Sequence, residues 1–248
     1  MKLNVFVSST KDGIMSNDKK YFPKLTKEER EMLYESSLTR FLSKRNIDRN
    51  KIIIINDKNT KHSAHTATTE NKNLKDKVIV LKDKTPNLVV AVETSDEPII
   101  MASAKNEQNE STCVVAKASI KNLNEDLLTL MVDTLMKETD APPFEMTFYI
   151  GACPSKENFI LDSVEELTSP IWKDTYEKKK KKYHLDLRYA IFNQLMKEIV
   201  DPNYIYFDSN DTTESDYFSD FTDKKGRHLE CVVYTVEEVY KNIYWDNE

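Results

Sequence analysis

The chain contains very little glycine, and this shortage excludes two common nucleotide-binding motifs. Gly13, Gly151 and Gly226 are the only glycines in 248 residues, and they are far apart. Phosphate-binding loops need clustered glycines, because the backbone must turn tightly and approach the phosphate groups closely. The sequence therefore has neither a P-loop nor a dinucleotide-binding fingerprint.

Cysteine is also scarce, and its spacing argues against a secreted protein held together by disulfides. Cys113, Cys153 and Cys231 are odd in number and form no CxxC pair. The first ten residues have too short an apolar stretch for a signal peptide, and the apolar runs at 52–55 and 98–104 are too short to cross a bilayer. We therefore expect reduced thiols, no association with membranes and a cytoplasmic location.

The chain as a whole carries fewer positive than negative charges. The sequence has 36 lysines and arginines against 42 aspartates and glutamates, which gives a formal net charge of −6. Binding of nucleic acid depends on neutralising phosphates with a basic surface, so the overall balance argues against a nucleic-acid partner. The five lysines at 178–182 are a local exception, which we interpret as a solvated loop or the end of a helix.

Short β-branched runs alternate with helical stretches along the chain. Thr26 and Glu29 form a capping box that predicts a helix to about Lys44. Three further helices are predicted from Asn122 or Asn124 to about Leu135, from Ser155 to about Leu167, and over residues 187–199. Nine strands are predicted, at residues 3–7, 51–55, 77–81, 88–92, 99–102, 112–118, 146–150, 204–207 and 229–234.

The segments at 57–75 and 210–225 are polar enough to be loops, and no Pro-rich or Ser-rich linker divides the chain. Interleaved strands and helices without a linker predict the α/β class, with one domain over residues 1–248 built on a mixed sheet.

Four segments carry a family resemblance when they are taken in order. They read FVSSTKDGIMS (6–16), IGACPSKENFILDSVEEL (150–167), HLDLRYAIFNQL (184–195) and YFSDFTDKKGRHLECVVY (217–234), the first being the weakest match. Together they resemble the YfiH or laccase-domain family, whose members are also described as multicopper polyphenol oxidases and as purine nucleoside phosphorylases. The resemblance implies a single-domain mixed-sheet sandwich with flanking helices and a site at one end of the sheets.

The resemblance also implies a site in which one cysteine and two histidines hold zinc or copper. Where the family has its second histidine, in a His-Ala-Gly-Trp-Arg-Gly string, this chain has Lys117, and an ammonium group has no lone pair for a metal. Where the family has its cysteine, the chain reads Thr94 to Pro98, so Asp96 or Glu97 replaces the thiolate. We therefore expect that the metal ligands are lost and that no metal cofactor is bound.

The first family histidine lies in a Gln-x-His-Gly motif after a strand. The corresponding segment offers His62, His65 or Lys58, of which His62 is the best candidate, although the polar surroundings favour a histidine on a surface loop. Lys121 keeps a positive charge near the family's Trp-Arg pair. Arg227 completes a preserved Gly-Arg pair and is a candidate for contacting an anion, with a structural ion pair as the alternative.

Two other groups of residues are weaker candidates for a functional site. Cys153, His184 and Asp186 supply the parts of a thiol triad, although chance spacing explains them easily and Cys153 falls where the family has an ordinary small residue. The carboxylates at 208–223 lack the alternating pattern of a calcium-binding loop.

We predict a degenerate member of this family that binds a purine nucleoside, phosphate or a protein partner without the family's metal chemistry. The alternative is a purine nucleoside phosphorylase or deaminase with a rebuilt active site, in which Lys117 acts as a base or binds phosphate. The candidate catalytic residues are His62, Glu97 and Lys117, and the candidate ligand-binding residues are Asp96, Lys121 and Arg227.

Overall fold

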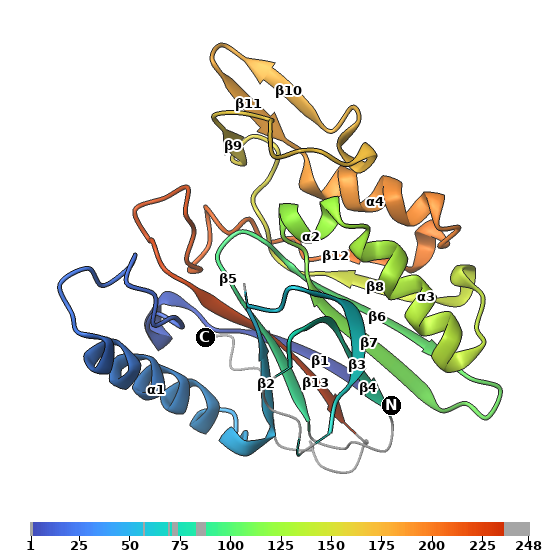
Figure 1. The fold of residues 1–248 in the computed structure, drawn as a ribbon, viewed down its shortest axis with the longest axis horizontal. Helices are drawn as coiled ribbons and strands as arrows, with labels where there is room; N and C mark the ends of the chain where they lie inside the picture. Colours follow the sequence, from blue (N-terminus) through green and yellow to red (C-terminus); the bar gives the residue numbers. More distant parts are fainter. Residues whose placement is uncertain (1, 57, 69, 71–73, 83–87, 236–248) are drawn as a thin grey trace.

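The computed structural model describes residues 2–56, 58–68, 70, 74–82 and 88–235 (Figure 1). Within these residues the helices are α1 (Lys27–Ser43), α2 (Ile120–Asn124), α3 (Leu127–Thr139) and α4 (Leu187–Lys197). The strands are β1 (Lys2–Val7), β2 (Ile52–Ile55), β3 (Lys61–Thr66), β4 (Asp76–Lys82), β5 (Val89–Thr94), β6 (Ile99–Lys105), β7 (Ser111–Lys117), β8 (Thr147–Ile150), β9 (Ile160–Leu161), β10 (Tyr176–Lys179), β11 (Lys182–Leu185), β12 (Ile205–Phe207) and β13 (His228–Thr235).

Two mixed sheets form the centre of the protein. One has the strand order β12-β8-β6-β7-β4-β3 and the other β1-β13-β5-β2, and each combines parallel with antiparallel pairs. Helix α1 covers the outer face of the four-stranded sheet, while α3 and α4 lie on the six-stranded sheet (Figure 1). A third sheet, β10-β11-β9, stands at one end. This architecture confirms the predicted mixed-sheet α/β sandwich with flanking helices.

The alternation of side chains along the strands explains these layers. In β5, Val89 and Ala91 pack toward α1, whereas Val90 and Val92 pack between the two sheets. Successive residues of a strand point to opposite faces, so a strand covered on both sides must be apolar throughout. The middle residues of the central strands satisfy this requirement, as at 78–81 in β4 and 113–116 in β7, and these strands account for most of the predicted ones.

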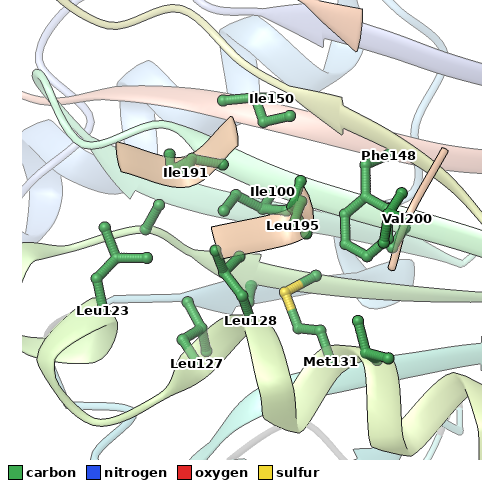
Figure 2. Packing of buried hydrophobic residues seen from close by; sticks show 14 of the residues in the cluster. Ile100, Leu123, Leu127, Leu128, Met131, Phe148, Ile150, Ile191, Leu195 and Val200 are labelled. Carbon is green, nitrogen blue, oxygen red and sulfur yellow. The ribbon is translucent and has the colours of Figure 1, made fainter. Parts of the chain in front are cut away.

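The face of the six-stranded sheet away from α1 carries the largest apolar cluster. Leu128 and Met131 of α3 and Leu195 of α4 pack against Ile100 and Phe148 of the sheet (Figure 2). Every one of these side chains is essentially buried. The apolar side chains of α3 and α4 therefore form part of the hydrophobic core.

The predicted elements agree with the structure in most places. All nine predicted strands are present within a few residues of their predicted ends, and the Thr26–Glu29 capping box opens α1. The helix predicted from Asn122 or Asn124 is two helices: Ser119 caps α2, and α3 begins after Asp126. Residues 210–225 contain no helix or strand, as predicted.

Three sequence predictions were wrong. The helix from Ser155 to Leu167 is replaced by turns and the short strand β9, because the Asp211 carboxylate binds the Ser155 amide and the Asn158 side chain and fixes a non-helical conformation. The predicted loop at 57–75 contains β3, a polar strand at the edge of the six-stranded sheet; residues 57, 69 and 71–73 lie outside the described residues. The lysine run forms the β10–β11 hairpin rather than a loop or helix end.

None of the described helices is both long and apolar enough to cross a lipid bilayer. The three cysteines are free thiols and buried.

Candidate functional site

A pocket of about 380 Å³ lies where the central strands of both sheets end. The turn between β5 and β6 contributes Ser95, Asp96 and Glu97, and the end of β7 contributes Lys117. The remaining walls come from α2, the segment after β2, the loop that precedes β9 and the loop that precedes β13. The pocket is lined by Asn56, Asn59, Thr60, Ser95, Asp96, Glu97, Lys117, Ser119, Ile120, Lys121, Asn122, Phe159, Asp220, Phe221 and Arg227.

An ion pair forms part of the lining of this pocket. Nζ of Lys117 lies 3.0 Å from Oε2 of Glu97, and the Lys117 side chain is only 2% exposed while that of Glu97 is 27% exposed. The Asn122 side-chain amide donates to the Lys117 carbonyl at 2.9 Å, which ties the start of α2 to the end of β7. Burying an ammonium group without a counter-charge is costly, and the Glu97 carboxylate supplies that counter-charge.

Asp96 lies beside this pair but is directed toward the neighbouring loop. Its Oδ1 accepts a hydrogen bond from the Thr212 hydroxyl and its Oδ2 accepts one from the Asp220 amide, both at 2.7 Å. Burial raises the pKa of Asp96, against the effect of these hydrogen bonds. Asp96 lines the pocket, and its carboxylate fastens the 210–225 loop to the β5–β6 turn.

Arg227 forms a second ion pair at the pocket wall. Its Nη1 lies 3.4 Å from Oδ2 of Asp220 and also donates to the Ser95 hydroxyl. Lys20 approaches Asp220 from the other side at 3.3 Å, and the Arg227 guanidinium lies 5.7 Å from the centre of the Tyr21 ring. The alternative considered for Arg227, a structural ion pair, is therefore present in the structure.

Two aromatic rings form the opposite wall. Phe159 and Phe221 meet edge to face, with ring centroids 5.1 Å apart and an interplanar angle of 61°. Both rings line the pocket; Phe159 is buried, and Phe221 is 37% exposed. Such a partly exposed ring provides a surface on which a planar ligand can stack.

The formal charges of the lining residues cancel. Three cationic side chains, of Lys117, Lys121 and Arg227, are matched by three carboxylates, of Asp96, Glu97 and Asp220. The other polar residues of the lining carry amide or hydroxyl groups, namely Asn56, Asn59, Thr60, Ser95, Ser119 and Asn122. The Asn59 side chain is fixed by its amide, which donates to the Asp76 carbonyl at 2.9 Å and the Leu74 carbonyl at 3.2 Å.

Five of the six predicted site residues converge on this pocket, and one does not. Asp96, Glu97, Lys117, Lys121 and Arg227 line it. The sixth residue, His62, is exposed on β3, where it lies close enough to Glu125 to assist Lys77 in lowering the pKa of that carboxyl.

The alternatives to His62 are not pocket residues either. Nδ1 of His65 lies 3.9 Å from Oδ2 of Asp76, and Lys58 is exposed. The segment instead places Asn56, Asn59 and Thr60 in the pocket wall.

Several lining residues were missed by the sequence prediction. Asn56 and Asn59 follow directly after the four isoleucines of β2, and polar residues at the end of a buried strand are a usable signal. Phe159 and Phe221 are 62 positions apart, and nothing in the sequence indicates that they meet.

The residues of the pocket do not fit a zinc or copper ion. Neither cysteine nor histidine lines it, and the ammonium group of Lys117 has no lone pair to donate. The part of the chain that the structure describes contains no cluster of three or more His, Cys, Asp or Glu with metal-binding geometry. The donor set therefore differs in kind from the one that the family resemblance implies.

The thiol triad considered from the sequence does not form. Cys153 is buried and contacts Arg188, with Nε 3.5 Å from Sγ, and burial raises the pKa of the thiol to about 12. The His184 ring lies 3.1 Å from the Glu157 carbonyl oxygen rather than beside Cys153. A neutral, buried thiol without a base is not an activated nucleophile.

Comparison with known structures identifies proteins that share this fold. Structures with the same fold include YfiH from Bacillus licheniformis, at 16% identity and a TM-score of 0.67 over 83% of this chain and 82% of that one. YlmD from Geobacillus stearothermophilus has 14% identity and a TM-score of 0.68, over 83% and 81% of the two chains. A Neisseria meningitidis protein of the DUF152 family has 18% identity and a TM-score of 0.62, over 83% and 82%.

At these identities the likeness establishes the fold. A search among curated proteins finds no match to the sequence. The family model for the multi-copper polyphenol oxidoreductase laccases matches residues 26–235, which include the whole pocket. The chain therefore belongs to the multi-copper polyphenol oxidoreductase laccase family, the group also known by its YfiH members.

Proposed function

We propose that this protein is a degenerate member of its family whose pocket binds a neutral, planar, polar molecule of the purine nucleoside class without a soft metal. The observation that carries this proposal is the Lys117–Glu97 ion pair, because it occupies the strand ends at which the family resemblance implies a histidine and a cysteine. An ammonium–carboxylate pair supplies hydrogen bonds and fixed charge, and it supplies neither the thiolate nor the imidazole ligands that the family resemblance implies for zinc or copper.

The charge balance of the pocket supports a neutral ligand over free phosphate. The cations of Lys117 and Arg227 each face a carboxylate, at 3.0 Å and 3.4 Å, so an incoming phosphate would compete with Glu97 and Asp220. Phosphate sites usually offer uncompensated donors or a bidentate arginine. The third cation, Lys121, is exposed.

The shape and chemistry of the walls support a nucleoside. Phe221 offers an exposed ring for stacking, and the amides of Asn56 and Asn122 stand on the other walls of the pocket. A volume of about 380 Å³ lies in the range of small-molecule sites. A flat heterocycle with a hydroxylated sugar would stack on the Phe221 ring and form hydrogen bonds with the two side-chain amides.

The test is calorimetric titration of the purified protein with adenosine and with inosine. Phe221→Ala should weaken binding by roughly tenfold, the scale of a lost base–aromatic stack. Phe144→Ala is the matched control, because Phe144 is 52% exposed and does not line the pocket. Equal affinities of the two variants would contradict the proposed binding mode.

The loss of metal chemistry is tested separately on the same preparation. We expect no stoichiometric zinc or copper by elemental analysis and no phosphate-dependent release of free base from either nucleoside. Protein that carries such a metal and releases base would overturn the proposal.

One observation favours a second function, a rebuilt phosphorylase or deaminase. Glu97 and Lys117 both line the pocket and are in contact, so they could exchange a proton with a bound nucleoside. In that case Lys117→Met should abolish turnover while nucleoside binding persists. Unchanged turnover in Lys117→Met would remove this alternative. Binding of a protein partner and a cytoplasmic location remain predictions.

A further inference from the structure

The β10–β11 hairpin carries the lysine run on a projecting arm of the protein. Figure 1 shows this hairpin extending beyond the two central sheets. All five lysines at 178–182 are exposed. Lys179 of β10 lies opposite Lys182 of β11 in the strand register, and the two-residue turn joins them. The hairpin is therefore a concentrated positive charge on a protein whose net charge is −6.

The two faces of the hairpin differ in how their charge is compensated. Residues 177, 179, 182 and 184 share one face, because alternate residues of a strand point the same way. On this face Lys179 pairs with Glu177, and Lys182 pairs with Asp162. Lys156 adds a further contact to Glu177 at 3.3 Å. The positive charge on this face is largely neutralised.

The opposite face combines lysine with tyrosine. Tyr176 and Tyr183 meet edge to face, with centroids 6.0 Å apart, and Nζ of Lys178 lies 5.2 Å from the centre of the Tyr183 ring. Tyr176 is 39% exposed. Among the described residues, no carboxylate lies within ion-pair distance of Lys178, Lys180 or Lys181. This face, with the turn, keeps its charge.

One lysine of the turn has a backbone conformation that other residue types adopt more readily. Lys180 has φ 58°, a left-handed conformation for which hairpin turns normally use glycine or asparagine. Asparagine occurs 19 times in this sequence, yet a lysine occupies this position. The turn adds charge at the expense of backbone preference.

We propose that this face of the hairpin, formed by Tyr176, Lys178, Lys180, Lys181 and Tyr183, binds single-stranded nucleic acid. Ammonium groups neutralise the phosphodiester backbone, and an exposed tyrosine ring stacks on an unpaired base. A duplex keeps its bases stacked inside and would leave Tyr176 unused. An acidic polypeptide satisfies the lysines but offers nothing for the ring to stack on.

The experiment measures fluorescence anisotropy of labelled twelve-nucleotide oligouridylate and oligothymidylate with the full chain. The variant Lys178→Gln/Lys180→Gln/Lys181→Gln should weaken binding at least tenfold at low salt. It should also reduce the slope of log affinity against log salt by about 2, since each phosphate contact to a single strand contributes roughly 0.7. Lys19→Gln/Lys24→Gln/Lys105→Gln removes the same charge from exposed positions elsewhere and should leave the affinity within about twofold.

Stacking is tested with Tyr176→Ala, which should weaken binding by roughly tenfold, and Tyr176→Phe, which should not. Circular dichroism of each variant confirms that the exposed substitutions leave the fold intact. Absence of binding at 50 mM salt, or equal loss in the two triple-lysine variants, would overturn the proposal. Equal competition by an oligoglutamate of the same charge, with no effect of Tyr176→Ala, would assign the face to an acidic polypeptide instead. The nucleoside pocket is not altered by any of these variants, so the two proposals succeed or fail independently.

Discussion

The backbone amide of Ile99 donates a hydrogen bond to Oε2 of Glu230 at 2.6 Å, which joins the first residue of β6 in one sheet to β13 in the other. Gly151 lies at the same point, because its amide donates to the Ile99 carbonyl at 2.9 Å. The carboxylate of Glu230 is buried, so this contact fixes the two sheets beside the pocket. A polar anchor of this kind determines how the sheets are positioned at their pocket end.

Gly151→Ala should destabilise the protein by about 1–3 kcal/mol, the usual cost of overpacking. A Cβ at Gly151 would lie 2.4 Å from Oε2 of Glu230 and 2.8 Å from Cγ2 of Ile99. Urea unfolding measures the loss. In a Glu230→Ala background the added methyl no longer meets the carboxylate, so its cost should be smaller; an identical cost in both backgrounds would refute this explanation.

Glu97→Gln and Lys117→Met should each destabilise the protein, and their effects should not add. Breaking a buried ion pair leaves one charge uncompensated, whereas removing both charges does not. The double variant should be more stable than the sum of the single losses predicts, by about 1–3 kcal/mol. Denaturant unfolding of the four proteins measures this coupling energy. Strict additivity would mean that the 3.0 Å contact contributes nothing.

The contribution of Asp211 to stability should disappear in acid. Burial raises the pKa of this carboxyl, but hydrogen bonds from Thr213, Ser155 and Asn158 outweigh it and lower the pKa well below its usual value of 3.8. A lowered folded-state pKa stabilises the protein above pH 3.8, and this stabilisation is lost as the pH falls toward the folded-state pKa.

The measurement is the difference in unfolding free energy between the wild-type protein and Asp211→Asn. This difference should be largest at pH 6 and shrink toward pH 3. A difference that grows on acidification would show the opposite sign of linkage and exclude this account.

Leu128→Ala in α3 should cost about 2–5 kcal/mol, because the side chain is 1% exposed and packs in the largest apolar cluster. Met136→Ala on the same helix is the control. Met136 is 41% exposed, and its truncation should change the stability by less than about 0.5 kcal/mol. Equal losses would contradict the view that α3 contributes through the packing seen in Figure 2.

The central strands could be predicted because they are apolar on both faces, as in β5 and β7. The strand β3 could not, since KHSAHT at a sheet edge has no apolar repeat. The segment after Ser155 was misread as a helix for a different reason. Its conformation depends on Asp211, 56 residues away, and local helix signals cannot report a partner at that distance.

The pocket residues follow the same rule as the fold: those marked by their local sequence could be predicted, and contacts between distant segments could not. Glu97 and Lys117 were found because each sits at a strand end within a family-like string, and β6 and β7 are adjacent. His62 does not line the pocket because its segment is a strand rather than a loop, and that strand places the histidine on the surface. The contact between Phe159 and Phe221 joins two loops, and only the folded structure brings them together.

The polar composition of β3, which prevented its prediction from the sequence, has a consequence for the folded molecule in solution. An outermost strand exposes unpaired amide and carbonyl groups that invite a second chain to continue the sheet. Here that strand carries Lys61 and His62 on exposed positions and has an irregular register with β4, while β12 at the other margin spans three residues. Both margins are therefore poor templates for intermolecular pairing, which protects an otherwise very apolar sheet from aggregation.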